Sequence, residues 1–199
     1  MERREVINEN DETRNHIVQV AAKLFGHFGF KKATMEEIAA ATRKGKSSIY
    51  YYFRSKEEIF EAVVEKEANE LKGELREEIA RYNDPIEQLR AYILLRMRKL
   101  RKVVNFYDAL KSDYLTHLDF IESIRRRFDE EEIQVVKEIL QNGADNGKFD
   151  IESPELAAVA IVTAMKGLEI PLLIQKSQGN LESRLDNLIN FLFYGLIKR

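Results

Sequence analysis

Cationic and hydroxyl-bearing side chains alternate over a short stretch of the chain, and this chemistry suits contact with a phosphate backbone. Five Lys or Arg residues and no acidic residue occur between Arg43 and Lys56, with three Ser and three Tyr residues among them. Cations that neutralise phosphates release counterions, and hydroxyl groups hydrogen-bond phosphate oxygens. The three consecutive tyrosines at 50–52 add aromatic area, which on a surface usually marks a contact. The stretch predicts a nucleic-acid contact.

Two short helices and a tight connection are expected to position these side chains. Thr34 and Glu37 have the spacing of a reciprocal capping box at the start of the first helix. Gly45 is expected to supply the backbone freedom for the turn. A second helix then follows over residues 47–53. A helix-turn-helix places such a second helix in the major groove, with its N-terminal residues against the base edges.

The candidate DNA contacts divide by chemistry. Ser47 and Ser48, at the N-terminal end of the second helix, would approach base edges, whereas Lys46 and Lys56 would neutralise phosphates. The full predicted set is Thr34, Arg43, Lys44, Lys46, Ser47, Ser48, Tyr50, Tyr51, Tyr52 and Lys56.

The same residues resemble a known family. The pattern TMEEIA at 34–39, followed by KSSIYYYF at 46–53 and SKEE at 55–58, is similar to the tetracycline-repressor (TetR) family of bacterial regulators. The resemblance implies about nine helices, a homodimer formed through the last two, and a small-molecule pocket among the central helices. It also implies that the long helix after residue 56 transmits ligand binding to the DNA-binding head. The chain departs from the family at Arg43-Lys44-Gly45, where members usually carry Gly-Val-Ser, and at Ser47, where Gly is usual.

Composition agrees with an all-α fold in which an N-terminal helix-turn-helix DNA-binding domain precedes a helical ligand-binding and dimerisation domain. The chain has only three Pro and is rich in helix-forming residues. We expect domains at 1–56, with a flexible arm over 1–12, and at 57–199. A net charge of −2 means that any DNA-binding surface is local. The absence of Cys fits a reducing cytoplasm.

The central helices carry the candidate ligand pocket. Bulky side chains mixed with a few polar groups are typical of such pockets and favour a hydrophobic or amphipathic ligand. Ordinary core packing is the alternative for each residue. The predicted lining is Tyr92, Arg96, Phe106, Tyr107, Leu110, Tyr114, Phe128 and Met165.

Two apolar C-terminal segments predict a homodimer interface. Residues 156–165 are nearly all apolar but are interrupted well short of the about 20 residues that a membrane span needs. A two-fold axis would bury both segments against their copies, although both could instead complete the core of one chain. The predicted interface residues are Leu156, Val159, Ile170, Leu185, Leu188, Ile189, Leu192 and Leu196.

Charge runs elsewhere are interpreted as surface. We expect the basic run at 96–102 to be a solvated helix face, and the acids at 129–132 to pair with the arginines at 125–127. No His pair has ligand spacing, and no nucleophile motif or phosphate loop occurs. We therefore expect no enzyme activity, no cofactor and no metal. The alternative to a DNA-binding regulator is a helical ligand- or partner-binding protein whose DNA-binding head has been weakened by the altered turn.

Overall fold

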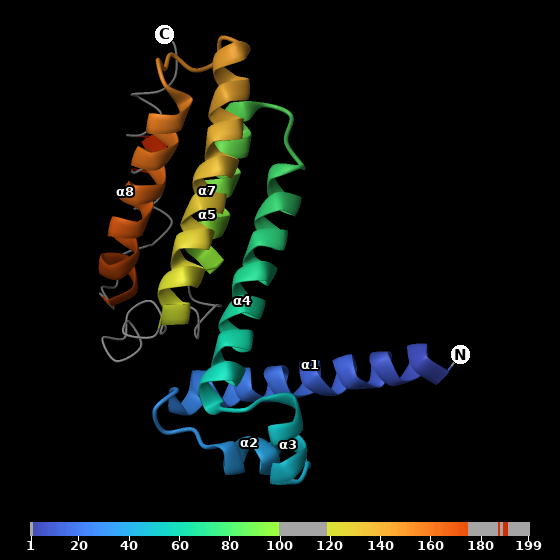
Figure 1. Cartoon of the computed structure of the whole chain (residues 1–199). Coiled ribbons are helices and arrows are strands. Elements are labelled where there is room, and N and C mark those ends of the chain that lie inside the picture. The colour runs from blue at the N-terminus through green and yellow to red at the C-terminus, as the bar shows by residue number, and fades with distance from the viewer. Residues whose placement is uncertain (1, 100–118, 175–186, 188, 191–199) are drawn as a thin grey trace. The chain divides into compact units, whose positions relative to one another are not determined.

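The computed structural model describes residues 2–99, 119–174, 187, 189 and 190 (Figure 1). Every regular element in these ranges is an α-helix, which confirms the all-α class. The helices are α1 (Glu2–Phe28), α2 (Met35–Ala41), α3 (Lys46–Tyr52), α4 (Lys56–Ile79), α5 (Pro85–Lys99), α7 (Asp119–Asp145) and α8 (Pro154–Ile174). The predicted total of about nine helices stays a prediction, since part of the chain lies outside these ranges.

The chain divides into two compact units whose boundary falls within α4, between Asn69 and Glu70. The first unit contains α1, α2, α3 and the start of α4. The second contains the rest of α4 together with α5, α8 and α7 from Ser123 onward. The predicted functional division at residue 56 stays a prediction.

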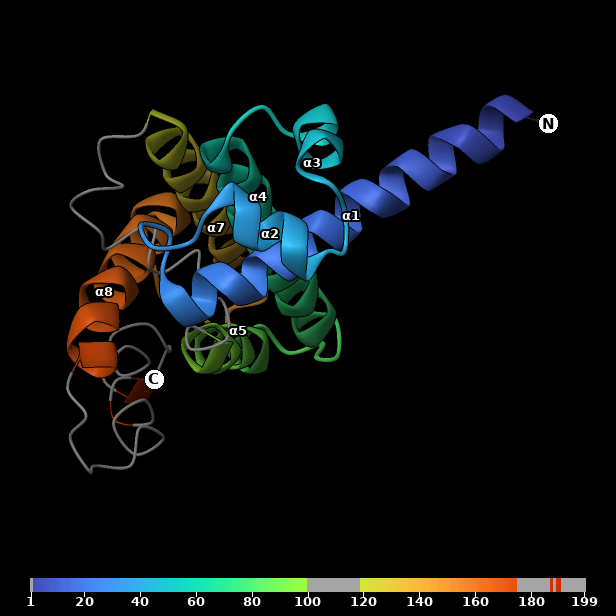
Figure 2. The ribbon, with the colours of Figure 1, turned by 90° about the horizontal axis from the view of Figure 1, so that it is seen from below.

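The first unit is built around a cluster of aromatic side chains. Phe25 of α1 lies 5.2 Å from Phe60 of α4 in an edge-to-face arrangement, measured between ring centroids, and Phe30 lies 4.7 Å from Phe60. Offset and edge-on ring pairs of this kind are favourable beyond the area they bury. Helix α2 packs against both α1 and α3 (Figure 2). Ile38 of α2 and Ile49 of α3 are fully buried and complete this core.

The N-terminal segment differs from the prediction of a loose arm. Helix α1 begins at Glu2 and runs through the segment where the arm was expected. Residues 2–12 contain neither Pro nor Gly, and nothing in them stops a helix from extending upstream. The arm prediction was wrong for this reason.

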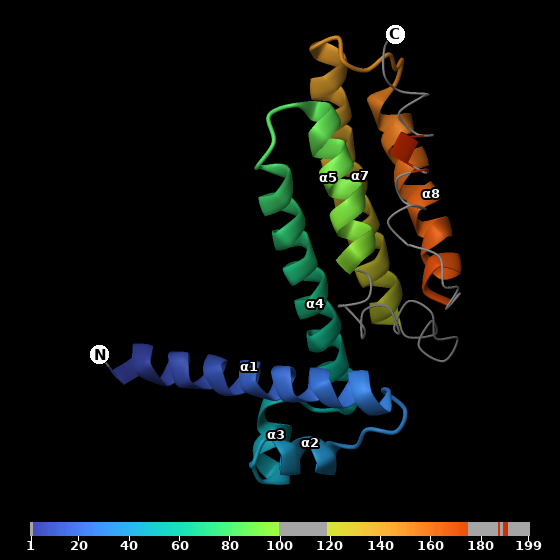
Figure 3. The ribbon, with the colours of Figure 1, turned by 180° about the vertical axis from the view of Figure 1, so that it is seen from behind.

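The second unit is a bundle in which α5, α7 and α8 run alongside one another (Figure 3). Side-chain caps are present at two of its helices. The Asp84 carboxylate accepts from the backbone N–H of Ile86, at 3.4 Å, and the Ser153 hydroxyl accepts from that of Leu156, at 3.3 Å.

None of the helices within 2–99 and 119–174 combines the length and apolar character that crossing a membrane requires.

Candidate DNA-binding surface and ligand cavity

The turn between α2 and α3 is a complete Schellman motif. The N–H of Arg43 donates to the carbonyl of Ala40 at 3.1 Å, and the N–H of Lys44 donates to that of Ala39 at 3.0 Å. Arg43 takes the left-handed conformation that the motif requires, with φ of 55°. Gly45 is extended, with φ of −66°, and forms the N-cap of α3. The prediction that Gly45 supplies the freedom of the turn was therefore wrong, because the left-handed position falls on Arg43.

The altered turn thus closes with both of its hydrogen bonds. The departure of this turn from the family pattern was the only reason to expect a weakened DNA-binding head. Since the turn forms both hydrogen bonds of a Schellman motif, that alternative loses its main support.

Helix α3 buries one side and exposes the other. Ile49 and Phe53 are fully buried, and the guanidinium of Arg14 in α1 lies 4.8 Å from the centre of the Phe53 ring. On the other side Ser47 is exposed, and Tyr51 exposes 73% of its surface. We call the outward residues Lys46, Ser47, Tyr50 and Tyr51 the α3 surface.

Tyr52 has a different environment from the other two tyrosines. Its hydroxyl donates to the side-chain carbonyl of Asn10 in α1, at 2.9 Å, and the residue is half-buried. Its ring lies 5.0 Å from that of Tyr51 in an edge-to-face arrangement. Tyr52 therefore ties α3 to α1 and supports the Tyr51 ring from behind.

The capping box at the start of α2 is confirmed. The Thr34 hydroxyl accepts from the backbone N–H of Glu37 at 3.2 Å, and the Glu37 carboxylate accepts from the backbone N–H of Thr34 at 2.9 Å. The same carboxylate also accepts from the Thr34 hydroxyl at 2.9 Å. Thr34 is exposed, so its predicted DNA contact is compatible with its position and stays a prediction.

Two predicted phosphate-binding lysines already have partners within the chain. Lys46 forms an ion pair with Glu36 of α2. Lys56 donates to the backbone carbonyls of Phe30, at 2.9 Å, and Ala33, at 3.0 Å. Lys56 thereby fastens the loop between α1 and α2 to the start of α4. Its predicted phosphate contact, like that of Lys46, stays a prediction.

The remaining candidates lie where DNA could reach them, and their predicted DNA contacts stay predictions. Arg43 is exposed, and Lys44 and Ser48 are half-buried near the start of α3. Sequence reasoning missed Glu36 and Asn10, which touch this set. Glu36 lies next to the capping glutamate and gave no separate signal, and Asn10 fell in the supposed arm.

A buried ion pair joins α5 to α7 in the second unit. Arg96 and Glu132 expose 3% and 5% of their surfaces, and the Nη2 of Arg96 donates to the Oε2 of Glu132 at 2.8 Å. The Tyr92 hydroxyl donates to the other carboxylate oxygen at 2.7 Å. Burial raises the pKa of Tyr92 well above its usual value, and the Glu132 carboxylate raises it further. The phenol therefore stays a neutral donor.

This ion pair corrects the surface interpretation of two charge runs. Arg96 faces the core rather than solvent, and Glu132 pairs with it rather than with the neighbouring arginines. Two other acids of the run also bind cations from other helices: Asp129 pairs with Lys166 of α8, and Glu131 with Lys72 of α4. Helix α7 presents these acids to its neighbours, a consequence of packing that local charge pattern does not reveal.

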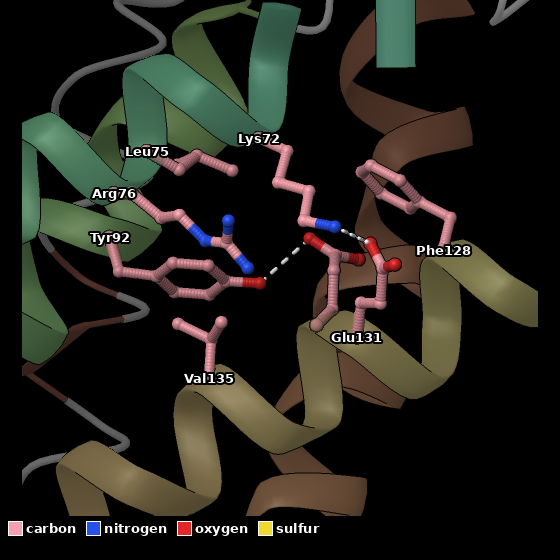
Figure 4. A pocket seen from close by; sticks show the side chains of 8 residues that line it. Lys72, Leu75, Arg76, Tyr92, Phe128, Glu131 and Val135 are labelled. Atoms are coloured by element: carbon pink, nitrogen blue, oxygen red, sulfur yellow. Dashed lines mark hydrogen bonds and ion pairs between the residues drawn. The ribbon is translucent and has the colours of Figure 1, made fainter. Parts of the chain in front are cut away.

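A small cavity lies beside the Tyr92–Glu132 hydrogen bond (Figure 4). Its volume is about 20 Å³, which is room for about one water molecule. The ring of Tyr92 and the side chains of Leu75 and Val135 surround it, with the Lys72–Glu131 ion pair at one side (Figure 4). The full lining is Lys72, Leu75, Arg76, Tyr92, Phe128, Glu131, Glu132 and Val135.

An open groove shares part of this lining. It has a volume of about 460 Å³, within the range of small-molecule sites. It shares Lys72, Arg76, Glu131 and Val135 with the cavity and continues along α4 and α7. The groove and the cavity together are the ligand-sized hollow that the described part of the second unit offers.

The predicted pocket residues separate into four groups. Tyr92 and Phe128 line the cavity, Arg96 is bound to Glu132 beside it, and Met165 is fully buried in α8. The other four predictions, Phe106, Tyr107, Leu110 and Tyr114, lie outside the described residues.

The predicted dimer residues are also placed in part. Leu156 exposes 71% of its surface and Val159 40%, one helical turn apart on α8. Ile189 is fully buried within its own chain and can bury no further area against a partner. Ile170 lies within α8, in a part of it where side chains are not described. Leu185, Leu188, Leu192 and Leu196 lie outside the described residues.

Among the described residues, no group of three or more His, Cys, Asp or Glu side chains has an arrangement that could hold a metal ion.

Comparisons with known proteins agree with the geometry of the first unit. Residues 17–63 match the family described as bacterial regulatory proteins, tetR family. The chain is 28% identical over 142 residues to the HTH-type transcriptional repressor KstR2 of Mycolicibacterium smegmatis, covering 68% of this chain and 67% of that protein. It is 34% identical over 86 residues to the HTH-type transcriptional repressor NicS of Pseudomonas putida, covering 42% of this chain and 41% of that protein.

A solved structure extends the likeness to the whole fold. The crystal structure of a transcriptional regulator from Cytophaga hutchinsonii superimposes with a TM-score of 0.77 and 27% sequence identity, covering 92% of this chain and 97% of that one. The helix-turn-helix match at 17–63 falls on the unit that carries the closed turn and the exposed face of α3. Residues 17–63 are therefore similar to the tetR family of bacterial regulatory proteins, and the chain as a whole is similar in fold to a transcriptional regulator.

Proposed function

We propose that this protein is a transcriptional repressor that binds a palindromic operator as a homodimer and leaves it when a small ligand binds. The α3 surface carries this proposal. Its hydroxyl, phenol and ammonium groups point outward because Ile49 and Phe53 anchor the helix from behind. These groups suit phosphate oxygens and base edges in a major groove. A regulator of chromosomal genes would act in the cytoplasm.

Exposed apolar side chains on α8 support the homodimer. Leu156 and Val159 lie on one face of a helix that is otherwise apolar enough to be buried. A two-fold axis would cover the same patch on both copies and set two α3 surfaces at a fixed separation. An operator with two-fold symmetry follows from that arrangement.

The hollow between α4, α5 and α7 supports a ligand that is hydrophobic or amphipathic. Leu75, Tyr92, Phe128 and Val135 give the inner cavity an apolar side, and charged side chains of α4 and α7 line both the cavity and the groove outside it. The cavity holds about one water molecule, so an apolar ligand group must push the helices apart to enter it. Because α4 extends from this hollow to the DNA-binding unit, its displacement is the proposed route to operator release.

The variant Tyr51→Ala tests the DNA-binding role of the α3 surface. We expect its affinity for the operator to fall at least tenfold, about 1.4 kcal/mol, because the ring is exposed and supports little of the fold. Tyr82→Ala, which removes another exposed tyrosine from the second unit, is the matched control and should bind like wild type. Sedimentation should show the same dimer for all three proteins. Loss of the dimer or of the fold in Tyr51→Ala would mean that the ring is structural.

A melting-temperature screen tests the ligand. A compound that binds only the folded state raises the melting temperature, by an amount set by its concentration relative to its Kd. We expect stabilising compounds among lipophilic and amphipathic molecules and not among small polar ones. An effective compound should also release the operator. If no lipophilic compound shifted the melting temperature, the ligand class would be wrong.

A further inference from the structure

Lys46 is the one cation of the predicted DNA-binding set that the described structure pairs with an acidic side chain. Its partner is Glu36, in the first turn of α2. The two side chains expose 53% and 61% of their surfaces, so the pair lies on the outside of the unit, next to the α3 surface. Lys46 also lies 5.9 Å from the centre of the Tyr50 ring.

The two acids of the first turn of α2 have different roles. Glu37 closes the capping box with Thr34, and its removal would leave the start of the helix uncapped. Glu36 takes no part in the cap and binds Lys46 instead. Glu36 can therefore be replaced without loss of the capping hydrogen bonds.

The pairing holds both groups in their charged forms. The hydrogen bond from Lys46 lowers the pKa of the Glu36 carboxyl, and the attraction between the charges adds to the shift. The same hydrogen bond raises the pKa of the Lys46 ammonium. At neutral pH the negative carboxylate of Glu36 therefore lies against the ammonium of Lys46, which the α3 surface would use to bind DNA.

A phosphate and a carboxylate repel each other, so a phosphate that approaches Lys46 opposes the pairing of Lys46 with Glu36. Binding DNA through Lys46 therefore weakens or breaks the pair with Glu36. Exposed ion pairs are weak, and breaking this one costs a factor of about two to five in affinity. Because phosphate contacts are independent of sequence, the cost applies to every duplex alike.

We propose that Glu36 competes with DNA phosphate for Lys46 and so lowers the affinity of the α3 surface for all duplexes. This rests on the proposed DNA-binding function. The pair acts as a built-in restraint on non-specific binding, which comes almost entirely from phosphate contacts.

A double-mutant cycle tests the competition. Wild type, Glu36→Gln, Lys46→Gln and the double variant are titrated by fluorescence anisotropy, at one salt concentration, against two labelled duplexes. One duplex carries an operator recovered by selection, and the other has an arbitrary fixed sequence. Glu57→Gln is the matched control, because it removes the same charge from an exposed acid for which the described structure shows no ion pair. Thermal melting checks that every variant folds.

We expect Glu36→Gln to bind both duplexes about two- to fivefold more tightly than wild type, leaving the ratio of the two affinities unchanged. In the Lys46→Gln background, and for Glu57→Gln, no such gain should appear. An equal gain with and without Lys46 would overturn the proposal in favour of simple repulsion between Glu36 and DNA. Weaker binding by Glu36→Gln would overturn it by showing that Glu36 orients Lys46 toward DNA.

The remaining outcomes separate this proposal from the function on which it rests. If wild type binds DNA but Glu36→Gln leaves both affinities unchanged, the competition is wrong and the DNA-binding function stands. If selection recovers no operator and wild type does not bind the arbitrary duplex at any salt concentration, both are wrong.

Discussion

At the scale of single residues, the backbone of Arg43 shows most clearly what the sequence could reveal. The capping box at Thr34 and the burial of Ile49 follow from local rules and were predictable. The left-handed residue of the turn was not, because the rule points to glycine and the nearest glycine is two positions away. Within the described residues, Arg43 is the one non-glycine residue with positive φ.

The strain at Arg43 predicts the effect of its replacement. A side chain in the left-handed conformation costs roughly 1–2 kcal/mol, of which the greater unfolded-state entropy of glycine cancels about half. We expect Arg43→Gly to raise the free energy of unfolding by about 0.5–1 kcal/mol, or the melting temperature by about 1–4 °C. Arg43→Ala, which removes the same charge but keeps the Cβ atom, is the control and should not stabilise. Equal melting temperatures for the two variants would contradict the strain.

The same position separates stability from DNA binding. Both variants lose one cation near α3 and should lose the same small amount of affinity, since a charge in this position acts without sequence preference. Arg43→Gly would then have a higher melting temperature than wild type but would not bind DNA more tightly.

At the scale of elements, local patterns predicted where helices occur but not which charges they bury. Spacing and caps predicted the two short helices of the first unit, whereas the start of α1 was misplaced. Glu132 was assigned to the surface because three acids precede it within four residues. Its burial depends on the rotation of α7 against α5, which no local window of sequence contains.

The Arg96–Glu132 pair predicts a large effect on stability. Removing one partner leaves an uncompensated buried charge, so Glu132→Ala should lower the free energy of unfolding by about 3–5 kcal/mol. A triple variant with Tyr92→Phe, Arg96→Met and Glu132→Leu removes every polar member of the network and should be far less destabilised. Denaturant unfolding measures both.

The exposed pair between Lys137 and Glu155 supplies the control for this comparison. Glu155→Ala should leave the unfolding midpoint nearly unchanged. If Glu132→Ala behaved like Glu155→Ala, the Arg96–Glu132 pair would not be buried as described. If the triple variant were the least stable of all, the network would be worth more than its desolvation costs.

At the scale of the whole molecule, the sequence predicted the all-α class and the similarity of residues 17–63 to the tetR family. The long, position-specific pattern at 34–58 made this possible. The ligand hollow was predictable only in outline. Two of the predicted lining residues, Tyr92 and Phe128, reach the cavity, but its charged members from α4 and α7 come together only through helix packing.

The distribution of charge predicts how the protein binds DNA. The net charge of −2 gives the chain no general attraction to a polyanion, so binding must come from the few cations beside α3. Affinity should therefore fall steeply with salt while sequence preference persists, because base contacts do not depend on counterion release.

Selection of bound duplexes from a random pool, followed by titration of the winner at several salt concentrations, tests the central claim most directly. If a dimer reads DNA through α3, the selected site is a palindrome with half-sites about one helical turn or more apart. Its affinity then declines linearly with salt on logarithmic axes. Recovery of no preferred sequence, with only weak salt-dependent binding, would contradict the claim and leave the helical hollow of the second unit as the working part of the protein.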